Sequence, residues 1–271
     1  MARISLVSRT ARIFLLFMAL TALAAPWIAP ANYADQFRSH AGEPPSRHFP
    51  LGVDDLGRDR LSRLLYGTRV SLFLAPAAAA VSVALASAIG VAAGLATPLV
   101  ARPLALSIDL LMSLPTLFLL LIARSILPLN AGPLSSLLVT FLLLGVLGWP
   151  ATARVIAASS RSLIGSAFVL QARALGCSSA RRLAAQLLPN LWPLVTAQFF
   201  LLVPIFIIAE ANLGILGLGV SEPVPSWGSM LAELTNPNAI RQAPWRLAPA
   251  ALLLMVVLSF HLAGTKRRQI E

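Results

Sequence analysis

Apolar runs of about twenty residues recur along this chain of 271 residues and constrain its fold more than any other feature. A helix of that length crosses a hydrocarbon core about 30 Å thick, since each residue adds about 1.5 Å of rise. No strand-like alternation competes with these runs, which argues against an outer-membrane barrel. Only 11% of the residues are charged, against about a quarter in a soluble domain. The sequence predicts an all-α integral membrane protein.

Six transmembrane spans are predicted, and they divide the chain into three regions. Residues 1–69 hold an N-terminal tail, the first span and a periplasmic segment. Residues 70–264 form a transmembrane domain with a cytoplasmic loop at 151–190, and residues 265–271 form a cytoplasmic tail. Pro115 falls in the third span and predicts a kink. The predicted spans cover residues 13–30, 70–97, 103–127, 134–151, 193–219 and 246–264.

The placement of arginine predicts that both termini are cytoplasmic. Short loops rich in Lys and Arg stay in the cytoplasm, and an N-in, C-in arrangement places the basic residues of 151–190 inside. Most acidic residues then lie outside, although the arginines at 58–69 weaken the bias. The formal net charge of +11 would suggest nucleic acid binding in a soluble protein. Here its distribution indicates membrane topology instead, and no nucleic acid partner is expected.

The first apolar run has an alternative explanation as a cleaved signal peptide. An arginine-rich flank and the sequence ALAAP are features of such a peptide. However, Pro26 and Pro30 stand where the run would leave the membrane, and no polar mature domain follows. The chain also begins at Met1. We therefore expect the first span to be retained.

The longest inside segment, 151–190, contains a basic helix–glycine–helix stretch. Residues 166–175 are predicted to be helical, and Gly176 breaks this helix. A serine at 178–179 can cap a second helix, which Pro189 is predicted to end.

The second of these helices is amphipathic. Arg181 and Arg182 lie on one side, and leucines at 183, 187 and 188 lie on the other. A short amphipathic helix pair of this kind can dock in the groove of a partner protein or lie on anionic lipid. Periodicity alone leaves both possibilities open.

This stretch resembles the EAA loop found in membrane subunits of binding-protein-dependent ABC importers. In the pattern E-A-A-x3-G with a downstream proline, Gly176 matches the glycine, Ala172 the second alanine and Pro189 the proline. Gln171 stands at the first alanine and Leu170 at the glutamate. The resemblance implies that this loop, with Arg181 and Arg182, couples the chain to an ATPase. The glutamate helps to anchor the loop in that family, and apolar packing could replace its contact here.

Three further stretches are similar to the dipeptide/oligopeptide/nickel permease subfamily. HFPLGVDDLGRDRLSRLLYGTRVSL at 48–72 resembles its H-P-x-G-T-D-x-x-G-R-D-x-x-S-R-x-x-Y-G-x-R-x-S-L signature, with Val53 at the threonine. LGILGLGVSEPVPSWGSML at 213–231 resembles L-S-F-L-G-L-G-x-x-x-P-x-P-S-W-G-x-M, and IDLLMSLP at 108–115 resembles D-x-x-x-x-x-P. The motifs follow the family's order and cover nearly the whole chain after the first span.

The resemblance implies a type I ABC importer transmembrane domain and a C-type permease subunit in a bacterial inner membrane. Implied partners are a second homologous permease, two ATPase subunits, a periplasmic or lipid-anchored solute-binding protein, and membrane lipid. ATP and Mg would bind the ATPases, because this chain has no G-x4-G-K-[ST] loop. No bound cofactor or catalytic activity is expected. Cys177 is the lone cysteine and the three histidines are scattered, so no metal site is expected either.

The expected function is to form half of a translocation pathway for di- or oligopeptides, coupled to the ATPase through residues 165–190. Import of nickel or another metal chelate is the first alternative. A self-sufficient secondary transporter and an intramembrane enzyme are weaker alternatives. The sequence lacks evident internal repeats and has neither a paired His–Glu nor a G-x-S-x-G motif with a partner histidine.

Two acids are expected at membrane depth, where charged residues usually face a cavity or a partner. Asp109 is near the start of the third span and close enough to the cytoplasm to be hydrated. Glu210 lies within the fifth span, followed by Asn212 and Gly214. These residues are candidates for the translocation pathway, with Glu210 favoured over Asp109. A hydrogen bond from Glu210 to a neighbouring helix is the alternative.

The outside segment before the second span carries alternating charge. Asp59 has i,i+4 spacing to both Asp55 and Arg63, so pairing within a helix is possible. This spacing favours a solvated interfacial helix, and contact with a partner protein is the alternative. Trp227, in a proline-rich turn, is interpreted as an interfacial anchor or as part of an outer gate. The candidates for periplasmic contact are Asp54, Asp55, Arg58, Asp59 and Trp227.

Overall fold

The computed structural model describes residues 2–126, 132–236, 240–241 and 243–264, and these residues are predominantly helical. Five helices or continuous helical runs within this part are long and apolar enough to cross a membrane. A sixth span is counted if the bent pair α3 and α4 is one span. The predicted cytoplasmic tail at 265–271 lies outside the described residues. The principal helices are α1 (Ala2–Ile28), α2 (Arg60–Leu95), α3 (Pro98–Ser113), α4 (Thr116–Ile126), α5 (Pro133–Leu147), α6 (Pro150–Ile164), α9 (Leu188–Ile215) and α12 (Ala248–Gly264).

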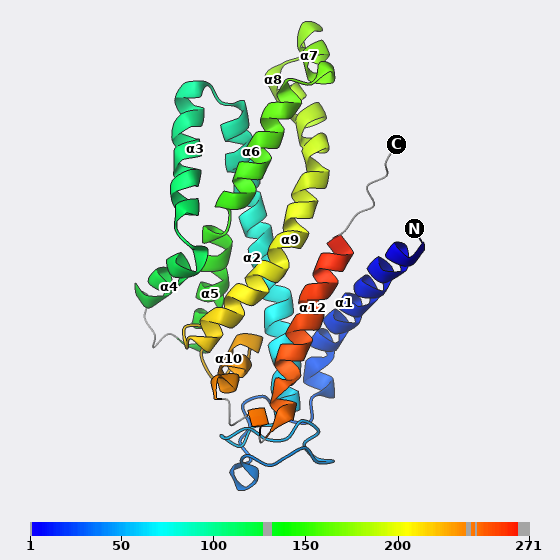
Figure 1. Ribbon diagram of the computed structural model, residues 1–271, viewed down its shortest axis with the longest axis vertical. Helices are drawn as coiled ribbons and strands as arrows, with labels where there is room; N and C mark the ends of the chain where they lie inside the picture. Colours follow the sequence, from blue (N-terminus) through cyan, green and yellow to red (C-terminus); the bar gives the residue numbers. More distant parts are fainter. Residues whose placement is uncertain (1, 127–131, 237–239, 242, 265–271) are drawn as a thin grey trace.

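Shorter elements occupy the two ends of the bundle. At one end are α7 (Ala167–Ala174), α8 (Ser179–Arg182) and the π-helical turn η2 (Leu183–Leu187). At the other end are α10 (Trp227–Ala232) and the 3-10 turns η1 (Arg38–His40), η3 (Glu233–Thr235) and η4 (Pro244–Leu247). Figure 1 shows the start of α1 and the end of α12 pointing to the side of α7, opposite the loop after α1. This arrangement agrees with the predicted N-in, C-in topology.

Helix α2 is the centre of the bundle, because it packs against α1, α5, α6 and α9. Its approach to α6 depends on small residues. A Cβ at Gly90 would lie 2.7 Å from the carbonyl oxygen of Ala153, so only glycine allows the two helices to come this close. The main apolar core includes Ala75, Phe206 and Trp227, which brings α2, α9 and α10 together.

Two predicted boundaries differ from the structure. Helix α2 begins at Arg60, so the predicted boundary between residues 69 and 70 falls inside it. The fourth predicted span continues past residue 151 as α6, because Pro150 occupies the first helical position, where its missing N–H costs nothing.

The third predicted span is not one straight helix. Helices α3 and α4 meet at an angle of 84°, and Figure 1 shows α4 turned away from the line of α3. Leu114 has φ −95° and ψ 129°, an extended conformation. A residue before proline is biased towards this conformation, so Pro115 accounts for a bend sharper than the predicted kink.

Pro189 does not end a helix, contrary to the prediction. Residues 179–215 run as one continuous helical segment of 37 residues. The π-helical turn η2 ends at Leu187, two residues before Pro189, and the Leu188 amide donates to the carbonyl of Leu183, five residues back. Proline in the first turn of the following helix, after this widened turn, does not have to break the run.

Candidate functional site

The cytoplasmic helix–glycine–helix stretch forms as predicted. The Gly176 amide donates to the Arg173 carbonyl at 3.1 Å, and the Cys177 amide donates to the Ala172 carbonyl at 3.0 Å. These two bonds define a Schellman motif that ends α7. Gly176 has φ +79°, a conformation that glycine adopts without steric cost. Ser178 then caps α8 by accepting a hydrogen bond from the Arg181 amide at 3.3 Å.

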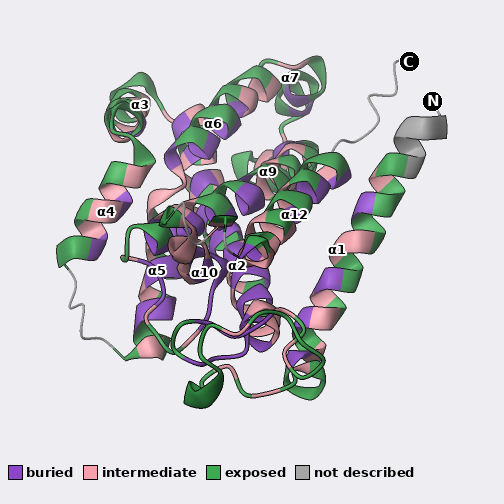
Figure 2. Cartoon of the chain, turned by 60° about the horizontal axis from the view of Figure 1, so that its bottom comes forward, coloured by how far each residue is buried: buried purple, intermediate pink, exposed green. Residues whose placement is uncertain are grey.

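Helix α7 turns one side inward and the other outward. Val169 and Ala172 are buried, and α7 packs against α6 and α8, so Ala172 has a packing role in this chain. Leu170 is 51% exposed and Leu175 is 76% exposed, and Figure 2 shows α7 at the outer edge of the molecule. Docking is a prediction for this stretch, and six of its exposed residues are called the docking surface for that reason: Phe168, Leu170, Gln171, Arg173, Leu175 and Arg181. This surface is apolar and basic.

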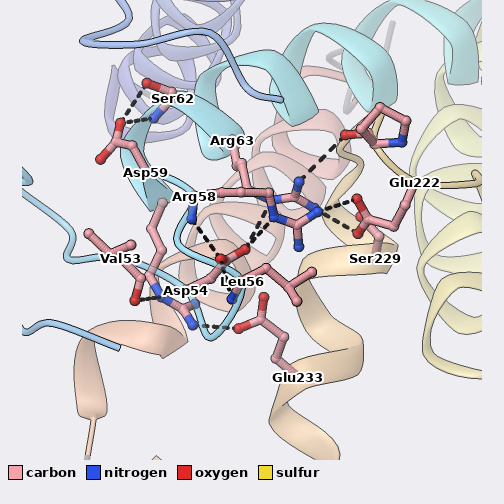
Figure 3. Close-up of polar contacts among 12 residues, drawn as sticks. Val53, Asp54, Leu56, Arg58, Asp59, Ser62, Arg63, Glu222, Ser229 and Glu233 are labelled. Atoms are coloured by element: carbon pink, nitrogen blue, oxygen red, sulfur yellow. Dashed lines mark hydrogen bonds and ion pairs between the residues drawn. The ribbon is translucent and has the colours of Figure 1, made fainter. Parts of the chain in front are cut away.

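Ion pairs between two buried arginines and the half-exposed Glu222 connect two distant segments at the opposite end. Arg58 donates to Asp54 at 2.7 Å and to Glu222 at 2.6 Å, and Arg63 donates to Glu222 at 2.9 Å. Figure 3 shows these side chains converging between the start of α2 and the loop after α9. We call Asp54, Arg58, Arg63 and Glu222 the ion cluster. Because Glu222 is more than 150 residues away from the other three members in sequence, the cluster fixes the approach of the two segments.

Charge balance explains why these arginines can be buried. Burial lowers the pKa of Arg58, but its hydrogen bond to Asp54 and the charges of Glu222 and Asp54 raise it by more. The net shift is upward, so Arg58 stays charged. Two neighbouring pairs extend the arrangement: Arg60 donates to Glu233 at 2.6 Å, and Arg246 donates to Asp55 at 2.8 Å.

The prediction of a solvated interfacial helix before the second span is wrong. Residues 48–59 form turns and loop, and Asp54, Arg58 and Asp59 are buried. Asp59 forms no ion pair with Arg63. Instead its carboxylate caps α2 by accepting from the Ser62 amide at 2.8 Å. The two residues that sequence spacing assigned to a local pair thus take different roles, because Asp59 caps α2 and Arg63 pairs with the distant Glu222.

Trp227 is not an interfacial anchor. Its side chain is 0% exposed, and its Nε1 donates to Thr68 Oγ1 at 3.2 Å. The exposed tryptophans at the ends of spans are Trp27 and Trp192. Among the five predicted periplasmic contacts, Asp54, Arg58, Asp59 and Trp227 are buried within this chain, and Asp55 alone is exposed.

Glu210 is fully buried where α9 meets α2 and α10. Its Oε2 accepts a hydrogen bond from Ser71 Oγ at 3.4 Å. A Cβ at Gly228 would lie 2.9 Å from Glu210 Oε1 and 2.8 Å from its carbonyl oxygen. The predicted alternative, a hydrogen bond to a neighbouring helix, is therefore what the structure shows. A pathway role for Glu210, and for the half-buried Asn212, stays a prediction.

Asp109 pairs with Arg154 and so connects α3 to α6. Their side chains are 51% and 54% exposed, which makes this pair more accessible than Glu210. Its place in the translocation pathway also stays a prediction.

Arg124 is a buried charge that the sequence analysis missed. This residue of α4 is 2% exposed, and it donates to the Leu218 carbonyl at 3.2 Å and to Ser136 Oγ at 2.8 Å. It thus ties α4 to α5 and to the loop after α9. An arginine inside an apolar run was the available signal. No comparable sequence signal marks Glu222 and Glu233 as ion-pair partners, because the arginines that they bind are more than 150 residues away.

Comparisons with known proteins identify the family. Residues 86–265 match the family described as the binding-protein-dependent transport system inner membrane component. The di/tripeptide transport system permease protein DppC of Pseudomonas aeruginosa is 34% identical over 260 residues, covering 93% of this chain and 83% of the relative. The oligopeptide transport system permease protein OppC of Bacillus subtilis is 29% identical, and the match covers 93% of this chain and 80% of the relative. The dipeptide transport system permease protein DppC of Haemophilus influenzae is 30% identical, and the match covers 93% of this chain and 85% of the relative.

The family description implies that such a chain works with a substrate-binding protein and an ATPase. The apolar spans, the helical bundle and the match over about two thirds of the sequence agree with membership of this family. This chain therefore belongs to the family of inner-membrane components of binding-protein-dependent transport systems, and it is a multi-pass permease with a type I ABC importer transmembrane domain.

Proposed function

We propose that this chain is the C-type permease subunit of a peptide importer and forms half of the translocation pathway with a second, homologous permease. The observation that carries this proposal is the set of peptide permeases to which the chain is about 30% identical over at least 80% of both sequences. The names of these relatives give no support to the nickel alternative. Two ATPase subunits would bind ATP and Mg and hydrolyse the ATP, and this chain would be non-catalytic.

The docking surface is the proposed point of coupling. Leu170 and Leu175 are exposed at the cytoplasmic end, and an ATPase groove of apolar character with an acidic rim would fit them and the adjacent arginines. Leu170 stands where the family has a glutamate. The partner is therefore expected to contact this position by apolar packing.

The continuous helix 179–215 offers a mechanical route from this surface to the far side. Its 37 residues span about 55 Å at 1.5 Å per residue. Its far end packs on α10 through Gly214 and Gly228. Movement of α7 and α8 on closure of the ATPase dimer would tilt this rod and alter the contacts around Trp227. ATP binding would thereby shift the population between inward-facing and outward-facing states.

Reconstitution with the partner subunits tests the proposal. The chain would be purified with its second permease, ATPases and binding protein and placed in liposomes. We expect ATP-dependent uptake of labelled di- and tripeptides that excess nickel leaves unchanged. A complex with inactive ATPases serves as the control. Peptide uptake in that control, or ATP-dependent nickel uptake without peptide uptake, would reject the proposal.

A further inference from the structure

A pocket of about 460 Å³ opens between α1 and the first half of α2. Leu23 of α1, Phe73 of α2 and Pro225 of the loop before α10 contribute apolar walls. Tyr33, Tyr66 and Arg69 add polar groups. The pocket is therefore amphipathic, with a cation beside an apolar surface.

Arg69 is the unusual member of this lining. It is exposed, and it forms no hydrogen bond or ion pair within the part of the chain that the structure describes. The nearby Tyr33 and Tyr66 rings pack edge to face, with centroids 4.9 Å apart. Their hydroxyl groups also have no hydrogen-bond partner among those residues. One cation and two phenols thus remain available to an anionic group from outside the chain.

The position of the pocket fits the edge of a membrane. Leu23 lies five residues before the end of α1 at Ile28, or about 7.5 Å along the helix. Bulky apolar residues such as Leu16, Phe17 and Leu20 are exposed along α1, as expected for a surface in contact with acyl chains. Arginine is well suited to binding phosphate, and at this depth a phospholipid headgroup is near.

We propose that this pocket binds one phospholipid of the extracytoplasmic leaflet, with its phosphate on Arg69 and an acyl chain along Leu23 and Phe73. A transported peptide fits less well, because one wall of the pocket comes from α1, which stands at the edge of the bundle (Figure 1). The proposal goes beyond peptide transport and does not depend on it. Since Val224 and Pro225 also line the pocket, the lipid would contact the loop that leads into α10.

Native mass spectrometry of the intact transporter complex would test this site. The complex would be titrated with phosphatidylglycerol, with diacylglycerol of the same chains, and with inorganic phosphate. Two variants change the pocket in different ways. Arg69→Gln removes the cation, whereas Leu23→Trp fills the apolar part of the pocket and leaves Arg69 in place. Arg47→Gln is the matched control, because Arg47 is exposed on the same side of the membrane and outside the pocket.

We expect the wild type and Arg47→Gln to bind one more phosphatidylglycerol per chain than either pocket variant. The apparent affinity should fall at least about tenfold in Arg69→Gln, as for loss of a charge-assisted hydrogen bond. Equal phosphatidylglycerol binding by all four proteins would overturn the proposal. The proposal would also be overturned if diacylglycerol bound as tightly as phosphatidylglycerol, or if inorganic phosphate displaced phosphatidylglycerol completely. A high-yield cross-link from position 69 to the second permease would show that protein fills the pocket instead.

Discussion

Arg63 on α2 donates a hydrogen bond to Glu222, 159 residues away, and so ties the start of α2 to the loop after α9. The arginine side chain is 2% exposed and the glutamate is 50% exposed. Glu222 also accepts from Arg58, so one half-exposed carboxylate serves two buried guanidinium groups. The loop that leads into α10 is thereby held against the segment that leads into the central helix.

Replacing Glu222 by Gln should destabilise the protein. The change leaves Arg58 and Arg63 with one carboxylate, Asp54, and we expect a loss of about 1–3 kcal/mol, moderated by the exposure of Glu222. Thermal unfolding of the purified complex would measure it. Glu43→Gln is the control, because Glu43 forms an exposed pair with His40. Equal melting temperatures for the two variants would show that the contacts of Glu222 add nothing to stability.

The cap on α2 makes a separate prediction. Asp59→Ala removes the acceptor for the Ser62 amide and should cost about 0.5–2 kcal/mol. Asp59→Asn should recover most of this loss, since asparagine is also a good cap. Circular dichroism melting curves of the three proteins would compare them. If the alanine and asparagine variants melt together below the wild type, the charge of Asp59 matters and the cap alone does not.

The helical architecture and topology could be predicted because they depend on local properties. Apolar length identifies spans, arginine placement orients them, and Gly176 and Ser178 mark the cytoplasmic loop through turn and cap chemistry. Each signal lies within a few residues of the feature it predicts.

The side-chain contacts at the extracytoplasmic end join residues that are distant in sequence, so spacing along the chain predicted the wrong partners there. Asp59 and Arg63 have i,i+4 spacing, yet Asp59 caps α2 and Arg63 pairs with Glu222. Tryptophan is a residue type common at the membrane interface, but Thr68 supplies the hydrogen-bond acceptor that allows Trp227 to be buried. Such pairings are set by tertiary packing, which periodicity does not encode.

The close packing of α9 on α10 predicts a steric requirement at Gly228. An added methyl group in Gly228→Ala would lie 2.8 Å from the Glu210 carbonyl and 3.0 Å from the Ala211 Cα. Both obstacles are backbone atoms, which leaves little room for relaxation. We expect reduced yield of folded complex, measured by size-exclusion chromatography. Gly132→Ala is the control, since the nearest atom to its added methyl group, Ser135 Oγ, would be 3.7 Å away. Normal yield from Gly228→Ala would mean that the helices separate at little cost.

The cytoplasmic turn at Gly176 should be essential for coupling. Proline fixes φ near −65° and has no amide hydrogen, whereas Gly176 has φ +79° and donates to Arg173. Gly176→Pro should therefore abolish uptake while membrane insertion stays normal. Asparagine tolerates the left-handed region, so Gly176→Asn should keep most activity. Uptake in proteoliposomes and the amount of ATPase that co-purifies would be measured together. Wild-type uptake by the proline variant would reject a docking role for this loop.

Glu210 and Asp109 allow a comparison between a buried and an accessible acid. Glu210 is fully buried between α9, α2 and α10, whereas Asp109 is half-exposed beside Arg154. Replacement of Glu210 by Gln alters a contact with no solvent to compensate, so we expect Glu210→Gln to reduce peptide uptake more than Asp109→Asn. Initial rates of uptake, normalised to the amount of complex, would compare them. A larger effect of Asp109→Asn would move the functional emphasis to the α3–α6 face, and wild-type rates in both variants would mean that neither acid is needed for transport.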